Sequence, residues 1–184
     1  MKVINIQPLA LIQKAVSHDR MAQQELYVQF APKMLSVCRT YIRDLHHAED
    51  VMITAFAKVF AKLHTFQNQG SFEGWIRRIM VCESLDYLRA QKEFMCVGDD
   101  SFFTDSHSDL DVQMDLEDIQ YHIDALPNGC KAVFVLYAIE GYKHHEIASM
   151  LQISEGTSKS QFHYAKQQLA AGINTDKKYR NGTK

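Results

Sequence analysis

Apolar residues recur three and four positions apart through most of this chain, and this spacing constrains the fold more than any other feature. An α-helix brings such positions onto one face, whereas a half-buried strand would need them at every second residue. The chain holds only 8 Gly and 3 Pro in 184 residues, which disfavours a turn-rich all-β fold. The sequence therefore predicts an all-α protein, and its 46% hydrophobic content indicates a globular chain with modest cores.

The first half of the chain predicts a four-helix bundle. Pro32 is expected to separate the first two helices, and a polar loop at residues 67–71 precedes the last. Ser71 is suited to cap that last helix, and we expect Trp75 to pack in the core of the bundle. The predicted helices cover residues 19–30, 32–45, 48–63 and 72–93.

Charge is unevenly distributed along the chain. Residues 95–127 contain nine Asp and Glu and no Lys or Arg, whereas residues 1–94 and 128–184 carry net charges of +3 and +4. Because residues 95–115 also lack helical periodicity, they predict an acidic linker between two helical domains. Composition leaves open whether this linker is simply solvated and self-repelling, or mimics or avoids nucleic acid.

The second domain, predicted at residues 116–173, ends in a helix-turn-helix pattern. Ile147 and Leu151 face inward from a short helix, and a tight turn at 152–154 places Ser154 as the cap of the next helix. The outer face of that helix carries Lys159, Ser160, His163, Lys166 and Gln167. Such a helix fits the DNA major groove and presents donors to base edges and phosphates. The same pattern also fits an ordinary helical hairpin, and residues 174–184 predict a frayed basic tail.

Nothing in the sequence predicts a metal, a cofactor or catalytic chemistry. Cys38, Cys82, Cys96 and Cys130 are too far apart for a CxxC knuckle, so we expect reduced thiols, mostly buried. The segment from His145 begins like the zinc-protease HExxH motif but has Ser149 where the second His belongs.

Targeting signals are also missing from the sequence pattern. No stretch approaches the roughly 18 apolar residues of a membrane span. The first eight residues lack the apolar core of a signal peptide. We therefore expect a cytoplasmic protein without membrane insertion.

Several motifs follow one another in a recognisable order. Residues 48–51 read AEDV, residues 72–79 read FxxWIxRI, and residues 86–89 read DxLR. Residues 133–160 then combine LYxxEG with EIAxxLxISxGTxKS. In this order, residues 9–173 resemble the extracytoplasmic-function (ECF) sigma factors of bacterial RNA polymerase. The resemblance implies a region 2-like domain at 9–94, an acidic linker at 95–115, a region 4-like helix-turn-helix domain at 116–173 and a basic tail at 174–184.

The resemblance also implies a function and a set of sites. A sigma factor is not an enzyme; it binds core RNA polymerase, directs it to promoter DNA and assists promoter melting, and an anti-sigma factor is an implied partner. The implied core polymerase contacts are Asp44, Glu49 and Asp50, although acids there also complement a helix N-terminus. The implied contacts to the single strand of the downstream promoter element are Gln67, Asn68, Gln69, Arg77, Arg78 and Arg89. The implied contacts to the upstream element are Thr157, Lys159, Ser160, His163, Tyr164 and Lys166.

The chain departs from the family pattern at several positions. Ile53-Thr54 replace the usual Gln-Glu, and Ser158 replaces the usual valine. Gln161, Phe162 and Tyr164 replace the common Arg, Leu and Arg, and fewer cations should weaken phosphate contacts. Two other hypotheses remain open: a helix-turn-helix regulator that binds an operator without core polymerase, and a helical protein-interaction adaptor, which only the near-neutral net charge favours.

Overall fold

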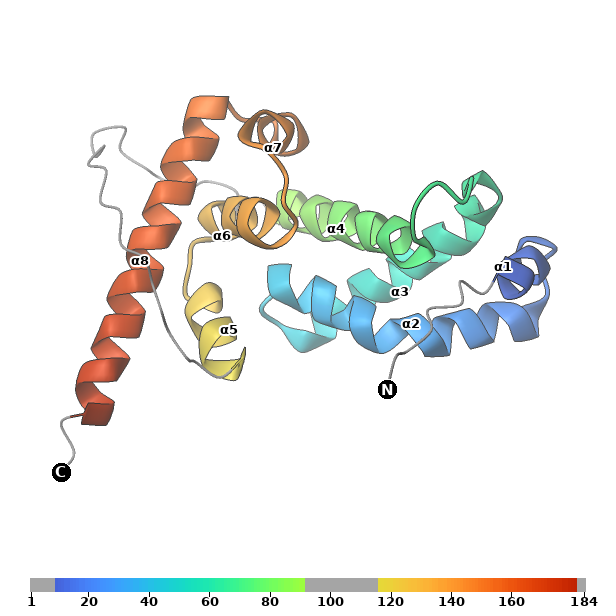
Figure 1. Cartoon of the computed structure of the whole chain (residues 1–184), viewed down its shortest axis with the longest axis horizontal. Coiled ribbons are helices and arrows are strands. Elements are labelled where there is room, and N and C mark those ends of the chain that lie inside the picture. The colour runs from blue at the N-terminus through green and yellow to red at the C-terminus, as the bar shows by residue number, and fades with distance from the viewer. Residues whose placement is uncertain (1–8, 92–115, 182–184) are drawn as a thin grey trace. The chain divides into compact units, whose positions relative to one another are not determined.

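Every regular element in residues 9–91 and 116–181, the ranges that this computed structural model describes, is a helix or a helical turn (Figure 1). This confirms the prediction of an all-α fold. The chain divides into two compact units, residues 1–87 and 88–184. The predicted acidic linker at 95–115 lies outside the described residues.

The N-terminal unit contains α1 (Leu9–Val16), α2 (Arg20–Tyr41), α3 (Leu45–Lys62), the 3-10 turn η1 (Leu63–Thr65) and most of α4 (Phe72–Ala90). Local caps define where these helices begin. The Asp19 carboxylate accepts from the backbone N–H groups of Met21 and Ala22 at the start of α2. The Ser71 hydroxyl accepts from the Gly74 N–H at 3.0 Å, as its predicted capping role requires.

The predicted break at Pro32 was wrong, because α2 continues through it. A proline in a helix removes the N–H that would bond to the carbonyl four residues earlier, here that of Val28. The Val28 side chain is 65% exposed, so this turn of the helix faces solvent, where water satisfies a freed carbonyl. On the opposite side a continuous buried stripe stabilises the helix across the proline; it consists of Leu26, Phe30, Met34, Val37, Cys38 and Tyr41.

An aromatic cluster occupies the end of the N-terminal unit where α4 begins. The Phe72 ring meets Phe30 edge-on at 5.5 Å and Phe66 edge-on at 5.1 Å, and Trp75 stacks on it at 5.9 Å. Trp75 is half-buried and also contacts Phe66. The indole therefore packs against the cluster, as predicted, with part of its surface open.

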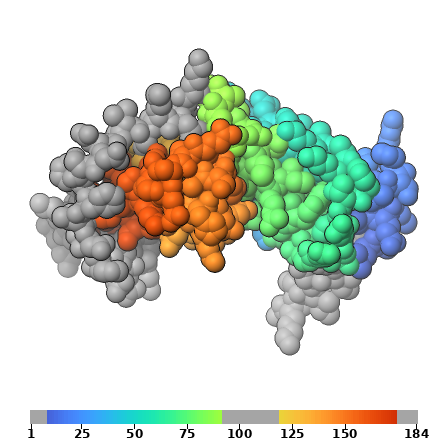
Figure 2. Space-filling view, turned by 90° about the horizontal axis from the view of Figure 1, so that it is seen from above, coloured from blue at the N-terminus to red at the C-terminus, as the bar shows by residue number. Residues whose placement is uncertain are grey.

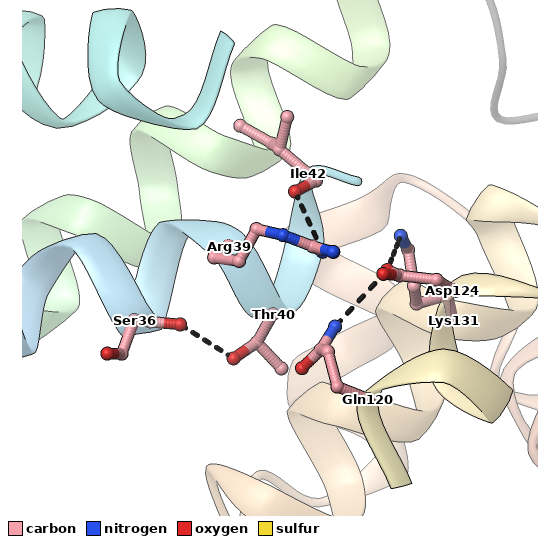
Figure 3. A network of polar contacts seen from close by, with 7 residues as sticks. All are labelled: Ser36, Arg39, Thr40, Ile42, Gln120, Asp124 and Lys131. Atoms are coloured by element: carbon pink, nitrogen blue, oxygen red, sulfur yellow. Dashed lines mark hydrogen bonds and ion pairs between the residues drawn. The ribbon is translucent and has the colours of Figure 1, made fainter. Parts of the chain in front are cut away.

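Polar contacts secure the helix ends and faces of the same unit. Arg39 donates to the Ile42 carbonyl, and Thr40 donates to the Ser36 carbonyl, at the C-terminal end of α2 (Figure 3). Two ion pairs tie α4 to its neighbours: Lys33–Glu73 reaches α2, and Lys58–Glu83 reaches α3.

The C-terminal unit contains α5 (Leu116–Asp124), α6 (Asn128–Phe134), a π-helical turn η2 (Val135–Ile139), α7 (His144–Leu151) and α8 (Glu155–Asn181). Pro127 precedes α6, at the predicted break. The last helix runs to Asn181, well beyond the end predicted near residue 173, so residues 174–181 of the segment predicted to fray are helical. The core of the unit comes from α6, η2, α7 and α8; its buried members include Val133, Leu136, Ile147, Leu151, Ala165 and Leu169.

Two further contacts fix α5. The Asp124 carboxylate, which is 8% exposed, accepts from Gln120 and from the buried ammonium of Lys131 (Figure 3). The His122 ring lies against Gly172 of α8 so closely that a Cβ at position 172 would stand 2.6 Å from its Nδ1. A side chain at 172 would therefore force the His122 ring to move.

The cysteines differ in part from the prediction. Cys38 is a buried free thiol, and burial raises its pKa to about 11. Cys82 is also outside any disulfide, but it is exposed. Cys130, in contrast, is disulfide-bonded, so the expectation of four reduced thiols was wrong. Spacing along the chain could not show this, because a disulfide can join residues far apart in sequence. Cys96 lies outside the described residues.

Residues 9–91 and 116–181 contain neither a membrane-spanning helix nor a cluster of metal-ligand side chains. No helix there is long and apolar enough to cross a membrane. No group of three or more His, Cys, Asp or Glu side chains within the same ranges is arranged to hold a metal ion.

Candidate nucleic-acid interface

A tight turn joins α7 to α8. Gln152 adopts a left-handed backbone conformation with φ of 56°, and the Ile153 N–H returns to the Ala148 carbonyl at 3.1 Å. Ser154 then caps α8, since its hydroxyl oxygen accepts from the Thr157 N–H at 2.9 Å. The predicted turn and cap are both present, and they hold the two helices in a helix-turn-helix arrangement.

The start of α7 is also fixed locally. The Glu146 carboxylate accepts from the Lys143 N–H at 2.7 Å. This is the glutamate half of a capping box; the other half is missing because a lysine side chain has no acceptor.

The outward face of α8 carries the side chains predicted to read DNA. Lys159, Tyr164 and Lys166 are exposed, and part of α8 lies open in the space-filling view (Figure 2). Lys159 pairs with Glu155 one turn earlier at 2.7 Å, and the Lys166 ammonium lies 5.8 Å from the centre of the Phe162 ring. An exposed pair of this kind is weak, so Lys159 can exchange Glu155 for a phosphate or a base edge.

The remaining predicted members of that face are half-buried. Thr157 shares a hydrogen bond with the capping Ser154 hydroxyl, and Ser160 donates to the Thr157 carbonyl. The His163 Nε2 lies 2.9 Å from the Gln167 side-chain amide nitrogen, within hydrogen-bond distance. His163 lies one turn beyond Lys159 on the same face, whereas Thr157, which bonds to the cap, lies at the edge of that face.

The structure corrects the expectation for Gln161. Its side chain is 8% exposed and points inward beside the fully buried Ser158. Position 161 is therefore not part of the outward face, so its glutamine does not reduce the positive charge of that face. Within the described part of the chain its Oε1 is buried and has no hydrogen-bond partner.

Sequence reasoning missed a contact that joins α7 to α8. The Nδ1 of His144 lies 2.9 Å from the Oγ of Ser158. The Tyr137 ring stacks on the His144 ring at 4.4 Å, and the Phe162 ring meets it edge-on at 5.8 Å. Burial, with a smaller effect from the nearby Lys159 charge, lowers the pKa of His144 below its ordinary value. The sequence signal for this contact was the hydroxyl of Ser158, at a position where a core residue is expected. Its partner, His144, lies 14 residues earlier in the chain, so spacing did not identify it.

The loop predicted to contact single-stranded DNA lies at the aromatic cluster of the other unit. Gln67, Asn68 and Gln69 are all exposed, directly after Phe66 of that cluster. Asn68 and Gly70 have φ of 56° and 94°, left-handed values that suit Asn and Gly. The loop therefore has a defined backbone that presents three amide side chains.

The three predicted arginines all lie on α4. Arg78 and Arg89 are exposed and share one helix face, about three turns and roughly 16 Å apart. Arg77 is half-buried and points about 100° away from Arg78. The structure thus aligns two of the three cations, with the third on a neighbouring side.

The predicted polymerase contacts lie at the start of α3. Asp44 caps the helix by accepting from the His47 N–H at 2.9 Å, and this hydrogen bond is the main reason that its pKa is lowered. Glu49 lies 3.8 Å from the His46 ring, and Asp50 is exposed. Ile53, 56% exposed, follows Glu49 by one turn, and exposed Thr54 likewise follows Asp50, so both departures from the family pattern fall on the acidic face.

Comparison with known proteins places both units in one family. Residues 26–94 match Sigma-70 region 2, and residues 116–169 match Sigma-70, region 4. The ECF RNA polymerase sigma factor SigE of Mycolicibacterium smegmatis is 30% identical over 152 residues, which cover 79% of this chain and 59% of that protein. This chain therefore matches less than two thirds of that relative's length. The RNA polymerase sigma-H factor of Pseudomonas aeruginosa is 24% identical over 86% of this chain and 90% of its own.

Solved structures share the fold. CnrH, in complex with the cytosolic domain of CnrY, matches with a TM-score of 0.51 and 21% identity over 91% of this chain and 97% of that one. The sigma factor RpoE of Bartonella quintana, in complex with the anti-sigma factor NepR, matches with a TM-score of 0.53 and 20% identity over 83% and 97%. Both sigma-70 regions are present in order, and the relatives include ECF sigma factors, so the chain belongs to the ECF sigma factor family.

Proposed function

We propose that this chain is a transcription initiation factor that binds core RNA polymerase, directs it to specific promoters and assists promoter melting. The observation that carries the proposal is the presence, in order, of both sigma-70 regions, each with an exposed polar surface suited to its task. We assign residues 9–94 to the region 2-like domain, 95–115 to an acidic linker, 116–173 to the region 4-like domain and 174–184 to a basic tail. The proposed location is the cytoplasm, where RNA polymerase acts.

In this proposal α8 reads the upstream promoter element. Lys159 and Lys166 are exposed cations on one side of its outward face, and Tyr164 offers an exposed phenol on the opposite flank of that face. Thr157, Ser160 and His163 supply further hydrogen-bonding groups. Lysine suits phosphate oxygens and guanine edges, while hydroxyl groups can bond to either bases or phosphates.

The loop at 67–69 and the arginines of α4 form the proposed downstream site. Three exposed amide side chains can bond to the edges of an unstacked base, and Arg78 and Arg89 can follow a strand's phosphates along one helix face. Arg77 is the least exposed member of the set. The site combines base-edge recognition with cationic contacts to the backbone.

The acidic start of α3 is the proposed contact with core polymerase. Asp50 is exposed, Glu49 is half-buried beside it, and Asp44 caps the same helix. Carboxylates in this arrangement suit a basic partner surface, where complementary charge speeds association and selects the partner. We also propose an anti-sigma factor as a regulator, since both structural neighbours are described as complexes with a second protein, one of them a named anti-sigma factor.

Two substitutions test the division of labour. Lys159→Ala should weaken promoter affinity while core polymerase binding stays normal, whereas Asp50→Ala should weaken core binding first. Lys14→Ala on α1 and Glu25→Ala on α2 are exposed, charge-matched controls outside both sites. Core binding is measured with purified polymerase and promoter affinity with the reconstituted holoenzyme. Equal loss of both activities in each variant, with circular dichroism unchanged, would refute the proposed sites; operator binding without polymerase would instead favour a simple regulator.

A further inference from the structure

The two helices of the helix-turn-helix are joined by a polar side-chain contact. Ser158 is fully buried on the inner face of α8, so its hydroxyl cannot reach water. His144, at the first residue of α7, places Nδ1 2.9 Å from that hydroxyl. The Tyr137 and Phe162 rings hold the imidazole from two sides. Four residues from three elements thus form one joint, which we call the His144 joint.

We infer that His144 is a positioning residue for promoter recognition: through the His144 joint, its neutral imidazole sets the orientation of the first turns of α8 and so of Lys159. This inference rests on the proposed DNA-reading role of α8. Ser158 precedes Lys159 in the chain, and both belong to the second turn of the helix. A displacement of the Ser158 hydroxyl therefore also displaces the Lys159 side chain. Recognition needs side chains held within about half an ångström of their working positions.

A neutral ring can satisfy both polar groups of the joint. With the ring proton on Nε2, Nδ1 accepts the Ser158 O–H, which satisfies the buried hydroxyl. Protonation turns Nδ1 into a donor, so the serine proton must find another acceptor. It also places a second positive charge near Lys159, partly offset by Glu155 on the same helix. The other titratable groups near the ring are His145 on α7 and the Tyr137 phenol on η2.

A hydrogen bond of this kind leaves a recognisable signature in a double-mutant cycle. Removing His144 strands the fully buried Ser158 hydroxyl, and removing Ser158 leaves the half-buried ring without this partner, whereas removing both leaves no orphan. A purely structural role predicts changes in stability alone. A positioning role predicts that promoter affinity changes in the same non-additive way.

The experiment uses the full chain in complex with core polymerase and compares His144→Phe, Ser158→Ala and the double variant. Each single variant should weaken promoter affinity by about tenfold, corresponding to one lost buried partner. The double variant should recover to within about threefold of the unmodified protein, and core binding should be unchanged in all three. Additive losses, or single variants with unchanged promoter affinity, would overturn the inference.

Two further measurements separate the possible causes. His144→Asn keeps an acceptor near the Nδ1 position, so it should retain more promoter affinity than His144→Phe; if the two are equal, the hydrogen bond does not position α8. This variant also provides the test if His144→Phe fails to fold. Lys159→Ala separates the two proposals. If it leaves promoter affinity intact, the DNA-reading role of α8 fails. If it weakens promoter affinity but the His144–Ser158 double-mutant cycle is additive, only the positioning role of His144 fails.

Discussion

The Asp44 carboxylate accepts a hydrogen bond from the backbone N–H of His47 at 2.9 Å, so a residue proposed to contact polymerase also caps the helix that presents the contact surface. The two roles use different properties of the side chain. Capping needs an oxygen acceptor, whereas attraction to a basic partner needs a negative charge. Substitutions that separate acceptor from charge can therefore assign the role of Asp44.

Asp44→Asn keeps a capping oxygen and removes the charge, whereas Asp44→Ala removes both. We expect the asparagine variant to unfold at nearly the original temperature and the alanine variant to unfold a few degrees lower, because only the alanine variant loses the cap. Core polymerase binding should weaken in both. Thermal unfolding by circular dichroism and a polymerase binding titration measure the two effects. Full core binding by Asp44→Asn would show that the residue acts only as a cap.

The lowered pKa of His144 predicts a pH dependence of stability. Because the folded protein binds this proton less readily than the unfolded chain, unfolding is favoured as pH falls below the ordinary histidine value of about 6.5. The contribution is fully present above that pH and declines until the folded-state pKa is passed. Thermal unfolding between about pH 5 and 8 should therefore show a smaller acid-induced loss in His144→Asn than in the unmodified protein. Parallel curves would contradict the assignment to His144.

The sequence carried enough information for the parts of the fold that depend on local chemistry. Ser71 and Ser154 were predicted as caps and do cap their helices, because a cap involves only the next three residues. Pro32 misled the prediction, since its local cost is outweighed by a buried stripe that extends along the whole of α2. A rule that considers only neighbouring residues cannot compare the local cost of a proline with the total burial along a helix.

The candidate site shows the same limit. Exposed Lys159 and Lys166 could be predicted from helical periodicity, but the inward position of Gln161 was missed. The His144–Ser158 contact depends on how α7 crosses α8, and no spacing rule links residues 14 apart in two helices. The spacing of the cysteines along the chain likewise did not indicate that Cys130 is disulfide-bonded. Contacts between elements, together with the extents of α2 and α8, were what the sequence left undetermined.

The Lys58–Glu83 ion pair should stabilise the N-terminal unit modestly. The Glu83 side chain is 12% exposed, and its hydrogen bond is the main reason that the pKa of Lys58 is raised. Glu83→Gln should lower the free energy of unfolding by up to about 1 kcal/mol in urea. Glu73→Gln, which weakens the more exposed pair with Lys33, is the matched control and should cost less. A larger effect at Glu73 would show that burial does not set the strength of these pairs.

The buried pair of the C-terminal unit should behave differently. Lys131 is 1% exposed at its side chain, and Asp124→Ala removes the carboxylate that faces its ammonium group. We expect a loss of about 3–5 kcal/mol in the free energy of unfolding, because a charge is left buried without this partner. The double variant Asp124→Leu/Lys131→Met should be considerably more stable than Asp124→Ala alone. A single variant within about 1 kcal/mol of the unmodified protein would contradict the importance of this pair.

The most direct test of the central claim is transcription in vitro with purified core RNA polymerase and a library of promoter fragments. The account predicts that adding this chain yields transcripts from a defined subset of promoters, that Lys159→Ala reduces them by weakening promoter affinity, and that Asp50→Ala reduces them by weakening core binding. Core polymerase alone should give none of these transcripts. Specific DNA binding by the isolated chain, with no promoter-specific transcript at any polymerase concentration, would contradict it.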